Sequence, residues 1–399
     1  MRYYRFMSKR ALIVTTVPIT LQAFLLPLSD ALRKRGWTVD ALTGQTQDEV
    51  MAGDTTELEA HFDTIHQIGW DRTLSSLTHL PELARRIREL IAQHDYDVVH
   101  VHTPIAAFVT RRALKQQPGD ERPHIIYTVH GFHFFDAEHP SLAARLFKAA
   151  ERNVIGVTDD LVVMNDMDEI AGRELVSLTQ LDERPATLHR IDGTGLDFGS
   201  FTRADAEDDR RALRESLGVP ADGIVVGMIA EMNENKRHEL VLKTAELLAD
   251  RQPSIHFLLI GSGPLEESLK QTVSGSSLDG LTHFTGQIPH DEVRQLIRIC
   301  DLGLLVSQRE GLPRSLMEFV ASGVAVIGTD TRGITDVVRD PSAISEPSAQ
   351  ALATMIEHFA TDEKDRSALA RQQYRNARSH YDLDIVIPQY IELFEGSDT

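Results

Sequence analysis

The stretch S-Q-R-E-G-L-P-R-S-L-M-E-F-V-A-S-G, residues 307–323, contains a helix whose start is marked by a proline and whose end is marked by a glycine. Pro313 suits the first turn of a helix, because its fixed φ and missing N–H cost nothing there. Gly323 suits the position just past the last turn. A helix of about residues 313–322 is therefore predicted, following the short apolar run Leu302–Val306.

Two carboxylates belong to this element. Glu310 is expected in the loop ahead of the helix, and Glu318 one to two turns inside it. The N–H groups of Arg314, Ser315 and Leu316 should point out of the helix start, where peptide dipoles favour an anion such as a diphosphate. The helix dipole alone would explain acids near a helix start. The predicted helix nevertheless combines an anion site at its start with two carboxylates, one before and one after that site, which could bind sugar hydroxyls.

Short apolar runs alternate with longer amphipathic stretches along the rest of the chain. This pattern is typical of helices that cover both faces of a parallel sheet, so the predicted fold class is α/β. The predicted strands are Ala11–Thr16, Thr38–Thr43, Val98–His102, His124–His130, Asp160–Asn165, Ile224–Ile229, Ile255–Ile260, Leu302–Val306 and Val324–Gly328. The helices predicted in the first half are Phe24–Gly36, Pro81–Gln93 and Ala106–Gln116.

The length and the charge limit the class of protein. A chain of 399 residues is long enough for two domains. The charged stretch Asp205–Gly223 predicts the boundary, which gives residues 1–204 and 205–377 as domains and about 378–399 as a terminal helix. A net charge of −19 argues against a nucleic-acid partner. The single Cys300 excludes an internal disulfide and is expected to be a small core residue.

The N-terminus superficially suits a secretory signal, because basic residues precede an apolar stretch. Thr15, Thr16 and Pro18 interrupt that stretch too soon, and residues 11–16 are interpreted as the first buried strand. No run of about 18 apolar residues occurs, so no transmembrane helix is expected.

Several motifs carry a family resemblance. The pattern E-G-L-P-x-S-x-x-E-x-x-A-x-G at residues 310–323 is similar to the signature of retaining, nucleotide-sugar-dependent glycosyltransferases of family 4. Further segments resemble the family in the family's order: H-G-F-H-F-F (His130–Phe135), A-E-M-N-E-N-K-R-H (Ala230–His238), L-I-G-S-G-P (Leu259–Pro264) and F-T-G (Phe284–Gly286). The resemblance implies the GT-B architecture, two Rossmann-like domains facing a cleft, with the segment Tyr381–Phe394 crossing back to the first domain.

The resemblance also implies roles for individual residues. Glu318 would hold the ribose hydroxyls, Glu310 would meet hydroxyls of the donor sugar, and His130 would lie near that sugar. Nucleotide contacts are implied at Gly261, Gly263, Pro264 and Gln287, with Arg314, Ser315 and Leu316 at the diphosphate.

Lys236 follows a predicted strand, and its ammonium would neutralise charge developing on a leaving diphosphate. The family usually pairs this lysine with an arginine, whereas this chain has Glu231 there. Either Lys236 acts with helix N–H groups alone, or another basic residue such as Arg237 or Arg314 substitutes.

The stretch Gly261–Pro264 comes directly after a buried strand, where glycines let backbone approach a ligand. A plain β–α turn is the alternative. Glu266 stands at the third glycine position of a dinucleotide-binding motif, which disfavours an NAD enzyme.

The first half of the sequence contains a histidine pair on a predicted strand and a further histidine among phenylalanines. His100 and His102 lie on one face of a strand and superficially resemble half a metal site, but no acid or cysteine has ligand spacing nearby. They are expected to be structural histidines at the cleft edge, and no metal or other cofactor is expected. His133 stands among Phe132, Phe134 and Phe135, ahead of a helix predicted over Pro140–Ala150; these phenylalanines are either core residues or an apolar lip.

The predicted reaction is transfer of a sugar from a nucleotide diphosphate to a glycan hydroxyl with retention of configuration. The resemblance favours a UDP-N-acetylhexosamine or UDP-hexose donor and a polyprenyl-diphosphate-linked acceptor in capsule or exopolysaccharide assembly. A sugar-nucleotide 2-epimerase would need a separate carboxylate pair, which we do not find. Glu231 keeps a non-catalytic nucleotide-sugar-binding protein open.

The predicted location is the cytoplasm, peripherally at the inner face of the cytoplasmic membrane. The basic residues proposed to meet an anionic membrane surface are Arg2, Arg5, Lys9, Arg10, Arg85, Arg86, Arg88, Arg111, Arg112 and Lys115. The alternative is a frayed start, with translation beginning at Met7, and ordinary solvated helix faces.

Overall fold

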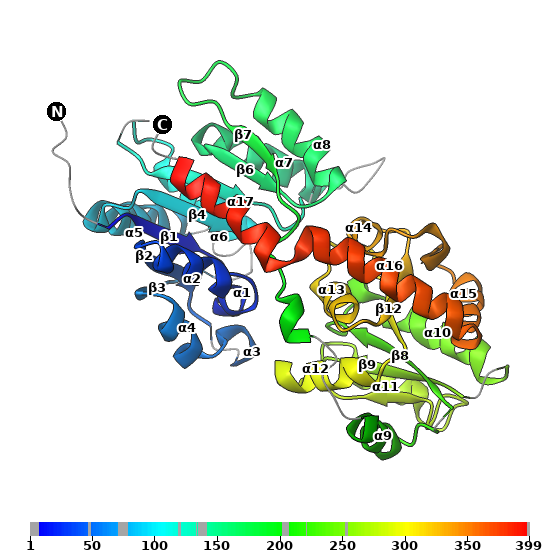
Figure 1. Ribbon diagram of the computed structural model, residues 1–399. Helices are drawn as coiled ribbons and strands as arrows, with labels where there is room; N and C mark the ends of the chain where they lie inside the picture. Colours follow the sequence, from blue (N-terminus) through cyan, green and yellow to red (C-terminus); the bar gives the residue numbers. More distant parts are fainter. Residues whose placement is uncertain are drawn as a thin grey trace. The chain divides into compact units, whose positions relative to one another are not determined.

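The computed structural model forms two compact units, each built on its own parallel sheet (Figure 1). It describes residues 8–46, 49–70, 79–118, 121–132, 134, 142–201, 207–220, 222–251 and 254–396. Unit 1 comprises Met1–Gly195 and Leu383–Thr399, and unit 2 comprises Leu196–Asp382. The α/β prediction is confirmed. The sequence placed the divisions after residues 204 and 377, whereas the structure places them after residues 195 and 382.

Unit 1 contains a seven-stranded parallel sheet of order β3-β2-β1-β4-β5-β6-β7. The strands are β1 (Arg10–Val14), β2 (Thr38–Gly44), β3 (Thr64–Ile68), β4 (Val98–His102), β5 (His124–Thr128), β6 (Asp160–Val163) and β7 (Thr187–Arg190). The sequence analysis missed β3 and β7. Both are edge strands with partly exposed, polar sequences, so neither shows the continuous apolar run of a strand buried on both faces.

The helices of unit 1 cover both faces of this sheet. They are α1 (Pro18–Phe24), α2 (Leu26–Lys34), α3 (Glu49–Ala52), α4 (Thr55–His61), α5 (Leu80–His94), α6 (Pro104–Leu114), α7 (Leu142–Val154), α8 (Asp166–Ser177) and α17 (Leu383–Glu395). The helix predicted over 24–36 corresponds to α2, whereas α1 was not predicted; the two are separated at Leu25, because Pro27 has no N–H to donate to the preceding turn. Gly36 has φ 85° just past α2, as predicted.

The C-terminal helix α17 completes the core of unit 1. It packs against α2, and the ring of Phe394 meets that of Trp37 edge to face at 5.7 Å. Tyr390 is buried, and its hydroxyl donates to the carbonyl of Gly193 at 3.1 Å. His100 packs against the rings of both Tyr390 and Phe394. The last helix of the chain is therefore part of the same hydrophobic core as the first strand.

Unit 2 contains a six-stranded parallel sheet of order β10-β9-β8-β11-β12-β13. The strands are β8 (Ile224–Ile229), β9 (Ile255–Ile260), β10 (Thr282–Phe284), β11 (Leu302–Leu305), β12 (Ala325–Thr329) and β13 (Ile344–Ser345). The edge strands β10 and β13 were not predicted, because three and two residues are too few to show a pattern. Cys300 is buried, as predicted, and burial raises the pKa of its thiol.

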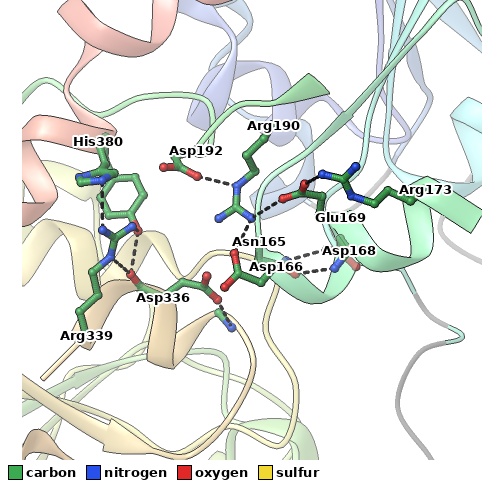
Figure 2. Close-up of polar contacts among 12 residues, drawn as sticks. Asn165, Asp166, Asp168, Glu169, Arg173, Arg190, Asp192, Asp336, Arg339 and His380 are labelled. Carbon is green, nitrogen blue, oxygen red and sulfur yellow. Dashed lines mark hydrogen bonds and ion pairs between the residues drawn. The ribbon is translucent and has the colours of Figure 1, made fainter. Parts of the chain in front are cut away.

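The helices of unit 2 are α9 (Glu207–Ser216), α10 (His238–Ala249), α11 (Glu266–Val273), α12 (His290–Ile299), α13 (Arg314–Ala321), α14 (Ile334–Val338), α15 (Ala349–Thr361) and α16 (Glu363–Tyr381). The end of α16 is fixed to α14. The Tyr381 hydroxyl donates to the carbonyl of Asp336 at 2.8 Å, and Arg339 lies 3.1 Å from His380 (Figure 2). Among the described residues, no helix is long and apolar enough to cross a membrane.

Candidate functional site

The strand order of unit 2 reverses between β8 and β11. The chain proceeds outward from β8 to β9 and β10, then returns to place β11 on the other side of β8. In open α/β sheets, ligands bind outside the carboxyl ends of the strands at such a reversal. The loops that follow these two strands are joined there, because Gln308 N donates to Asn235 O at 2.8 Å and Asn235 Nδ2 donates to Arg309 O at 3.1 Å.

Two predicted site residues meet at this reversal. Lys236 Nζ donates to Glu310 Oε1 at 2.5 Å, and both side chains are mostly buried. Lys236 ends a short 3₁₀ turn, Glu234–Lys236, in which Asn233 Oδ1 accepts from Lys236 N at 3.2 Å. The structure therefore places an ammonium and a carboxylate next to each other at the end of the sheet, each held by a loop of fixed shape.

The loop that carries Glu310 is also held from its other side. Arg332 Nε donates to Glu310 O at 3.0 Å. Gly333 has φ 79°, and a Cβ at this position would overlap the carbonyl oxygen of Gly311. Only glycine suits this position, because it tolerates both the left-handed backbone and the close approach. The sequence analysis missed Arg332 and Gly333, although a glycine soon after the buried strand β12 was the available signal.

Glu318 is buried in α13, with 3% of its surface exposed. Its Oε1 accepts from Arg314 Nε at 2.9 Å and from His290 Nε2 at 3.0 Å. Burial by itself would raise the pKa of Glu318, but the hydrogen bonds and charges of His290 and Arg314 outweigh it, so the pKa lies below its ordinary value. Glu318 is therefore a fixed carboxylate. His290 was not found from the sequence, where nothing links it to Glu318.

The start of α13 agrees with the prediction in outline. Pro313 has an extended backbone and precedes the helix as its N-cap, instead of lying within the first turn. Met317 N is the first amide to bond within the helix, to Pro313 O at 3.3 Å. The amides of Arg314, Ser315 and Leu316 come before that first bond, so they are the ones that a helix start can offer to an anion.

The glycines after β9, Gly261 and Gly263, are required by close contacts within the protein, whereas the sequence suggested that they let the backbone approach a ligand. Gly261 has φ 127°, and a Cβ there would overlap the carbonyl oxygen of Ala230. A Cβ on Gly263 would lie 2.6 Å from Met232 O. These glycines let two backbone segments of the protein pass each other, which accounts for their presence without any ligand. Pro264 follows in the same turn.

Gln287 and Ser262 lie at the same sheet edge, and the Ser262 hydroxyl is 3.3 Å from Gln287 Oε1. Gly261 N donates to Gly286 O at 3.2 Å, so the loop after β10 is joined to the loop after β9. The structure thus brings the predicted nucleotide-contacting residues to one edge. Their roles stay predictions.

Glu231 stands where the resembling family usually has an arginine, and its surroundings indicate which other cation could serve instead. Glu231 is exposed, and Arg314 is engaged by Glu318, whereas Arg237 is half-buried with φ 53°. Among the described residues, Arg237 has no carboxylate partner. The adjacent His238 is buried, and both of its ring nitrogens lack a hydrogen-bond partner in the described structure. Burial, with Lys236 nearby, lowers the pKa of His238 to about 4.

Unit 1 has its own residues at the carboxyl edge of its sheet. His130 follows β5, and its Nε2 lies 3.0 Å from Nδ1 of His102. His100 Nε2 lies 2.7 Å from the Thr128 hydroxyl. Burial lowers the pKa of His130 to about 4 and of His100 to about 3, and it lowers that of His102 well below its ordinary value. His100 and His102 are fully buried, as expected of structural histidines, and their expected position at a cleft edge stays a prediction.

Asp168 holds the segment that follows His130. Its Oδ1 accepts from the backbone N–H of Phe132 at 2.9 Å, while Asn165 caps α8 by accepting from Asp168 N at 2.8 Å (Figure 2). Phe132 and Phe134 are buried with rings 4.9 Å apart, so they are core residues. The predictions for His133, Phe135 and Pro140 concern residues outside those that the structure describes. Asp168 was missed, although an Asn three residues before an Asp is a common helix-start pattern.

The strand order of unit 1 reverses between β1 and β4, and this point contains a strained residue. Thr103, just after β4, has φ 61°, which is an outlier for a β-branched residue. Its hydroxyl oxygen accepts from Thr16 N at 2.9 Å, across the reversal. Backbone strain of this kind is concentrated at functional sites. The sequence analysis did not single out Thr103.

The basic surface predicted for unit 1 is corrected by the structure. Arg111 is fully buried, and its Nη2 pairs with Glu151 at 2.9 Å. Arg85 pairs with Glu89, and Lys115 donates to the carbonyl of Asn153. Arg2, Arg5 and Met7 fall outside the described residues. Among the described residues, no group of three or more His, Cys, Asp or Glu could hold a metal ion.

Comparisons with known proteins agree with this two-unit description. Residues 22–167 match the family model of Glycosyltransferase Family 4, and residues 209–378 match that of Glycosyl transferases group 1. The chain is 28% identical over 338 residues to the putative glycosyltransferase EpsD of Bacillus subtilis, covering 84% of this chain and 82% of EpsD. It is 25% identical to the putative teichuronic acid biosynthesis glycosyltransferase TuaC of Bacillus subtilis, covering 75% and 71%.

A solved structure shows the same fold. Anabaena HepE in complex with UDP-glucose superimposes with a TM-score of 0.74 at 20% sequence identity, covering 97% of this chain and 99% of HepE. At this identity the likeness establishes the architecture.

Proposed function

This chain is a retaining nucleotide-sugar glycosyltransferase of family 4 that acts in polysaccharide biosynthesis, and we propose that it takes its sugar from a UDP-linked hexose or N-acetylhexosamine. The acceptor proposed is a glycan intermediate on a polyprenyl diphosphate. The complex of HepE with UDP-glucose supports UDP as the nucleotide. The description of TuaC as a putative teichuronic acid biosynthesis glycosyltransferase supports a polysaccharide as the product.

The ion pair of Lys236 with Glu310 is the observation that carries this proposal. It lies at the carboxyl edge of the sheet, where the strand order reverses. A diphosphate bound there would take the ammonium, and hydroxyls of the sugar would take the carboxylate. On donor binding, Lys236 would exchange its contact with Glu310 for one with the diphosphate. Glu310 would exchange its contact with Lys236 for hydrogen bonds to the sugar hydroxyls. Neither charge would be left unpaired in the partly buried site, which would otherwise be costly.

Catalysis would then consist of positioning and charge stabilisation. Negative charge grows on the leaving diphosphate as the sugar acquires oxocarbenium character, and Lys236 with the first amides of α13 would stabilise it. The departing phosphate oxygen would accept the proton of the attacking hydroxyl on the same face of the sugar. The new bond therefore forms on the side from which the diphosphate leaves, and the configuration is retained.

Glu318 would recognise the ribose. Its carboxylate is held ionised by Arg314 and His290, and a charged acceptor makes stronger hydrogen bonds to hydroxyls than a neutral one. Arg237, the half-buried cation beside Lys236, is the residue we propose for the place of the family's usual arginine. It is preferred over Arg314, because Arg314 already serves Glu318.

Incubation of the purified protein with a panel of nucleotide sugars tests the proposal. We expect a UDP-sugar to raise the midpoint of thermal unfolding more than GDP- or ADP-sugars do, and to be hydrolysed slowly without acceptor. Release of the sugar as its C2 epimer would identify an epimerase instead. Binding without hydrolysis, and without transfer to a lipid-extracted acceptor fraction, would identify a non-catalytic binding protein.

A further inference from the structure

His102 and His130 form a side-chain pair at the carboxyl edge of the unit 1 sheet. His102 is the last residue of β4, and His130 lies two residues after the end of β5. Nδ1 of His102 and Nε2 of His130 are 3.0 Å apart, which is a hydrogen-bond distance. A hydrogen bond between two neutral imidazoles needs one N–H and one bare nitrogen, so this contact determines which nitrogen of each ring carries the proton.

Both rings of the pair are neutral near pH 7. Burial lowers the pKa of His130 to about 4. Burial also holds the pKa of His102 well below its ordinary value, and the nearby rings of His100 and His130 add to this effect. A neutral imidazole has one N–H and one bare nitrogen, so only two arrangements of the hydrogen bond are possible: either His102 donates, or His130 does.

The surroundings of His102 Nε2 favour one of these arrangements. That nitrogen is buried and has no hydrogen-bond partner among the described residues. If His130 donated to His102, the proton of His102 would lie on Nε2, where it would be a buried donor without an acceptor. Buried N–H groups without an acceptor are rarer in proteins than buried acceptors without a donor. The favoured arrangement therefore has Nδ1–H of His102 donating to the bare Nε2 of His130.

The proton of His130 then lies on Nδ1, on the other side of its ring. His130 is half-buried, whereas His102 is fully buried, so the ring of His130 is the one that a ligand can reach. In the part of the chain that the structure describes, Nδ1 of His130 has no hydrogen-bond partner. The pair thus leaves a single N–H donor at this point of the sheet edge.

The backbone that follows His130 is held as well. Gly131 has φ 107°, a left-handed conformation that favours glycine. The N–H of Phe132 donates to Oδ1 of the buried Asp168 at 2.9 Å. Asp168 is itself fixed by Asn165, as Figure 2 shows. The ring of His130 is therefore fixed through its Nε2 and through the backbone after it, which gives Nδ1–H a defined direction.

We propose that His102 is a positioning residue, which holds His130 as a neutral Nδ1–H donor toward an oxygen of the donor sugar. The place of the sugar beside His130 rests on the proposed function. A neutral donor suits this place, because the sugar gains positive charge in the transition state and a charged histidine would repel it. The other tautomer would present a bare nitrogen, which could only accept a proton from a sugar hydroxyl.

NMR of the histidine ring nitrogens in the free, full chain tests the position of the protons. Isotope-labelled histidine makes the rings visible, and the signals lost in His130→Asn and in His102→Phe assign the two residues. We expect Nδ1 to be protonated and Nε2 to be bare in both rings. His102→Phe removes the donor and should release His130 to a mixture of tautomers. His102→Asn can donate from its amide and should keep His130 in the Nδ1–H form.

Turnover separates positioning from a structural role. We expect kcat/KM for the UDP-sugar to fall about three- to tenfold in His102→Phe, the effect of one neutral hydrogen bond, and to recover in His102→Asn. The affinity for UDP, which lacks the sugar, should not change. His100→Phe is the matched control, because His100 is equally buried on the same strand but hydrogen-bonds Thr128. It should lower stability in urea without altering kcat/KM or the tautomer of His130.

Three results would overturn the role of His102. They are a proton on Nε2 of His130 in the unaltered chain, an unaltered kcat/KM in His102→Phe, and an equal loss of kcat/KM in His100→Phe. The NMR measurement needs no sugar nucleotide and no variant that folds. A chain with the expected tautomers that neither binds nor hydrolyses a UDP-sugar would therefore refute the proposed function, and with it the sugar as the acceptor of the His130 hydrogen bond. A proton on Nε2 in a chain that transfers sugar would refute the role of His102 alone.

Discussion

Lys236 Nζ and Glu310 Oε1 lie 2.5 Å apart, although 74 residues separate the two in the sequence. The contact exists because β8 and β11 are neighbours in the sheet, and because the loops after them are joined by hydrogen bonds between Gln308, Asn235 and Arg309. The pair can either hold the two loops together or bind the donor, and only the second role predicts an effect of these residues on turnover.

Glu310→Gln removes the charge that Lys236 meets and keeps the size of the side chain. We expect the affinity for UDP to change little, because the lysine is then released to the diphosphate, and we expect turnover of the UDP-sugar to fall, because the sugar loses a charged hydrogen-bond acceptor. Calorimetry with UDP and with the UDP-sugar checks this. A loss of UDP affinity equal to the loss of turnover would assign Glu310 a structural role.

Glu318→Gln should weaken UDP binding by about 1.5–3 kcal/mol, the usual value of hydrogen bonds to a charged group. The carboxylate is held by Arg314 and His290, so its orientation is fixed before the nucleotide binds. Calorimetry with UDP and with uracil base measures the effect, which should be absent for the base. Glu246→Gln, an exposed change on α10, is the control. Unaltered UDP affinity would remove Glu318 from the ribose site.

Gly333→Ala should lower both stability and turnover. The left-handed backbone disfavours a side chain by about 1–3 kcal/mol, and the added methyl would push the Glu310 loop away. Gly275→Ala is the matched control, since Gly275 has φ 69° and nothing within 4 Å of a Cβ. The control should be less stable, as measured by urea unfolding, but should keep its turnover. Equal turnover in the two variants would show that the position of the Glu310 loop does not matter.

The buried histidines of unit 1 predict a pH dependence of stability. His100 and His130 have pKa values of about 3 and 4 in the folded chain, lowered by burial, against about 6.5 when unfolded. The unfolded chain therefore binds more protons below pH 6.5, and the stabilisation present above pH 6.5 is lost as the pH falls through that value toward 4.

Urea unfolding between pH 7.5 and 5 measures this effect. Each such histidine contributes a slope of at most about 1.4 kcal/mol per pH unit. His130→Asn should flatten the curve, whereas His358→Asn, which alters a half-exposed ring, should leave it unchanged. A free energy of unfolding that is flat from pH 7.5 to 5 would contradict the account.

The sequence predicted best where a strand is buried on both faces. The bounds of β4, β8 and β9 agree with the predicted ranges, because each strand is mostly apolar and ends at a polar or glycine-containing loop. The edge strands β3 and β7 were missed, since one side of each meets solvent and their residues alternate too irregularly. Pro27 was the visible signal that a helix begins near residue 26 and that a separate helix could precede it.

The site was predicted residue by residue but not as a set of contacts. Proline and glycine located α13, and its position fixed Glu310 ahead of the helix and Glu318 within it. The partners of those carboxylates depend on strand order and helix packing, which the local sequence does not contain. For that reason the pairing of Lys236 with Glu310 was not predicted, and His290, Arg332 and Asp168 were not identified.

Turnover of Lys236→Ala with the UDP-sugar that the unaltered enzyme uses is the most direct test of the site. We predict that kcat falls about 10²–10³-fold, with a smaller change in the affinity for the donor, because the charge that the ammonium meets grows in the transition state. Lys243→Ala, an exposed change on α10, should leave both quantities unaltered. A variant that keeps its kcat and loses only donor affinity would show that Lys236 anchors the ground state, and would contradict its role in the departure of the diphosphate.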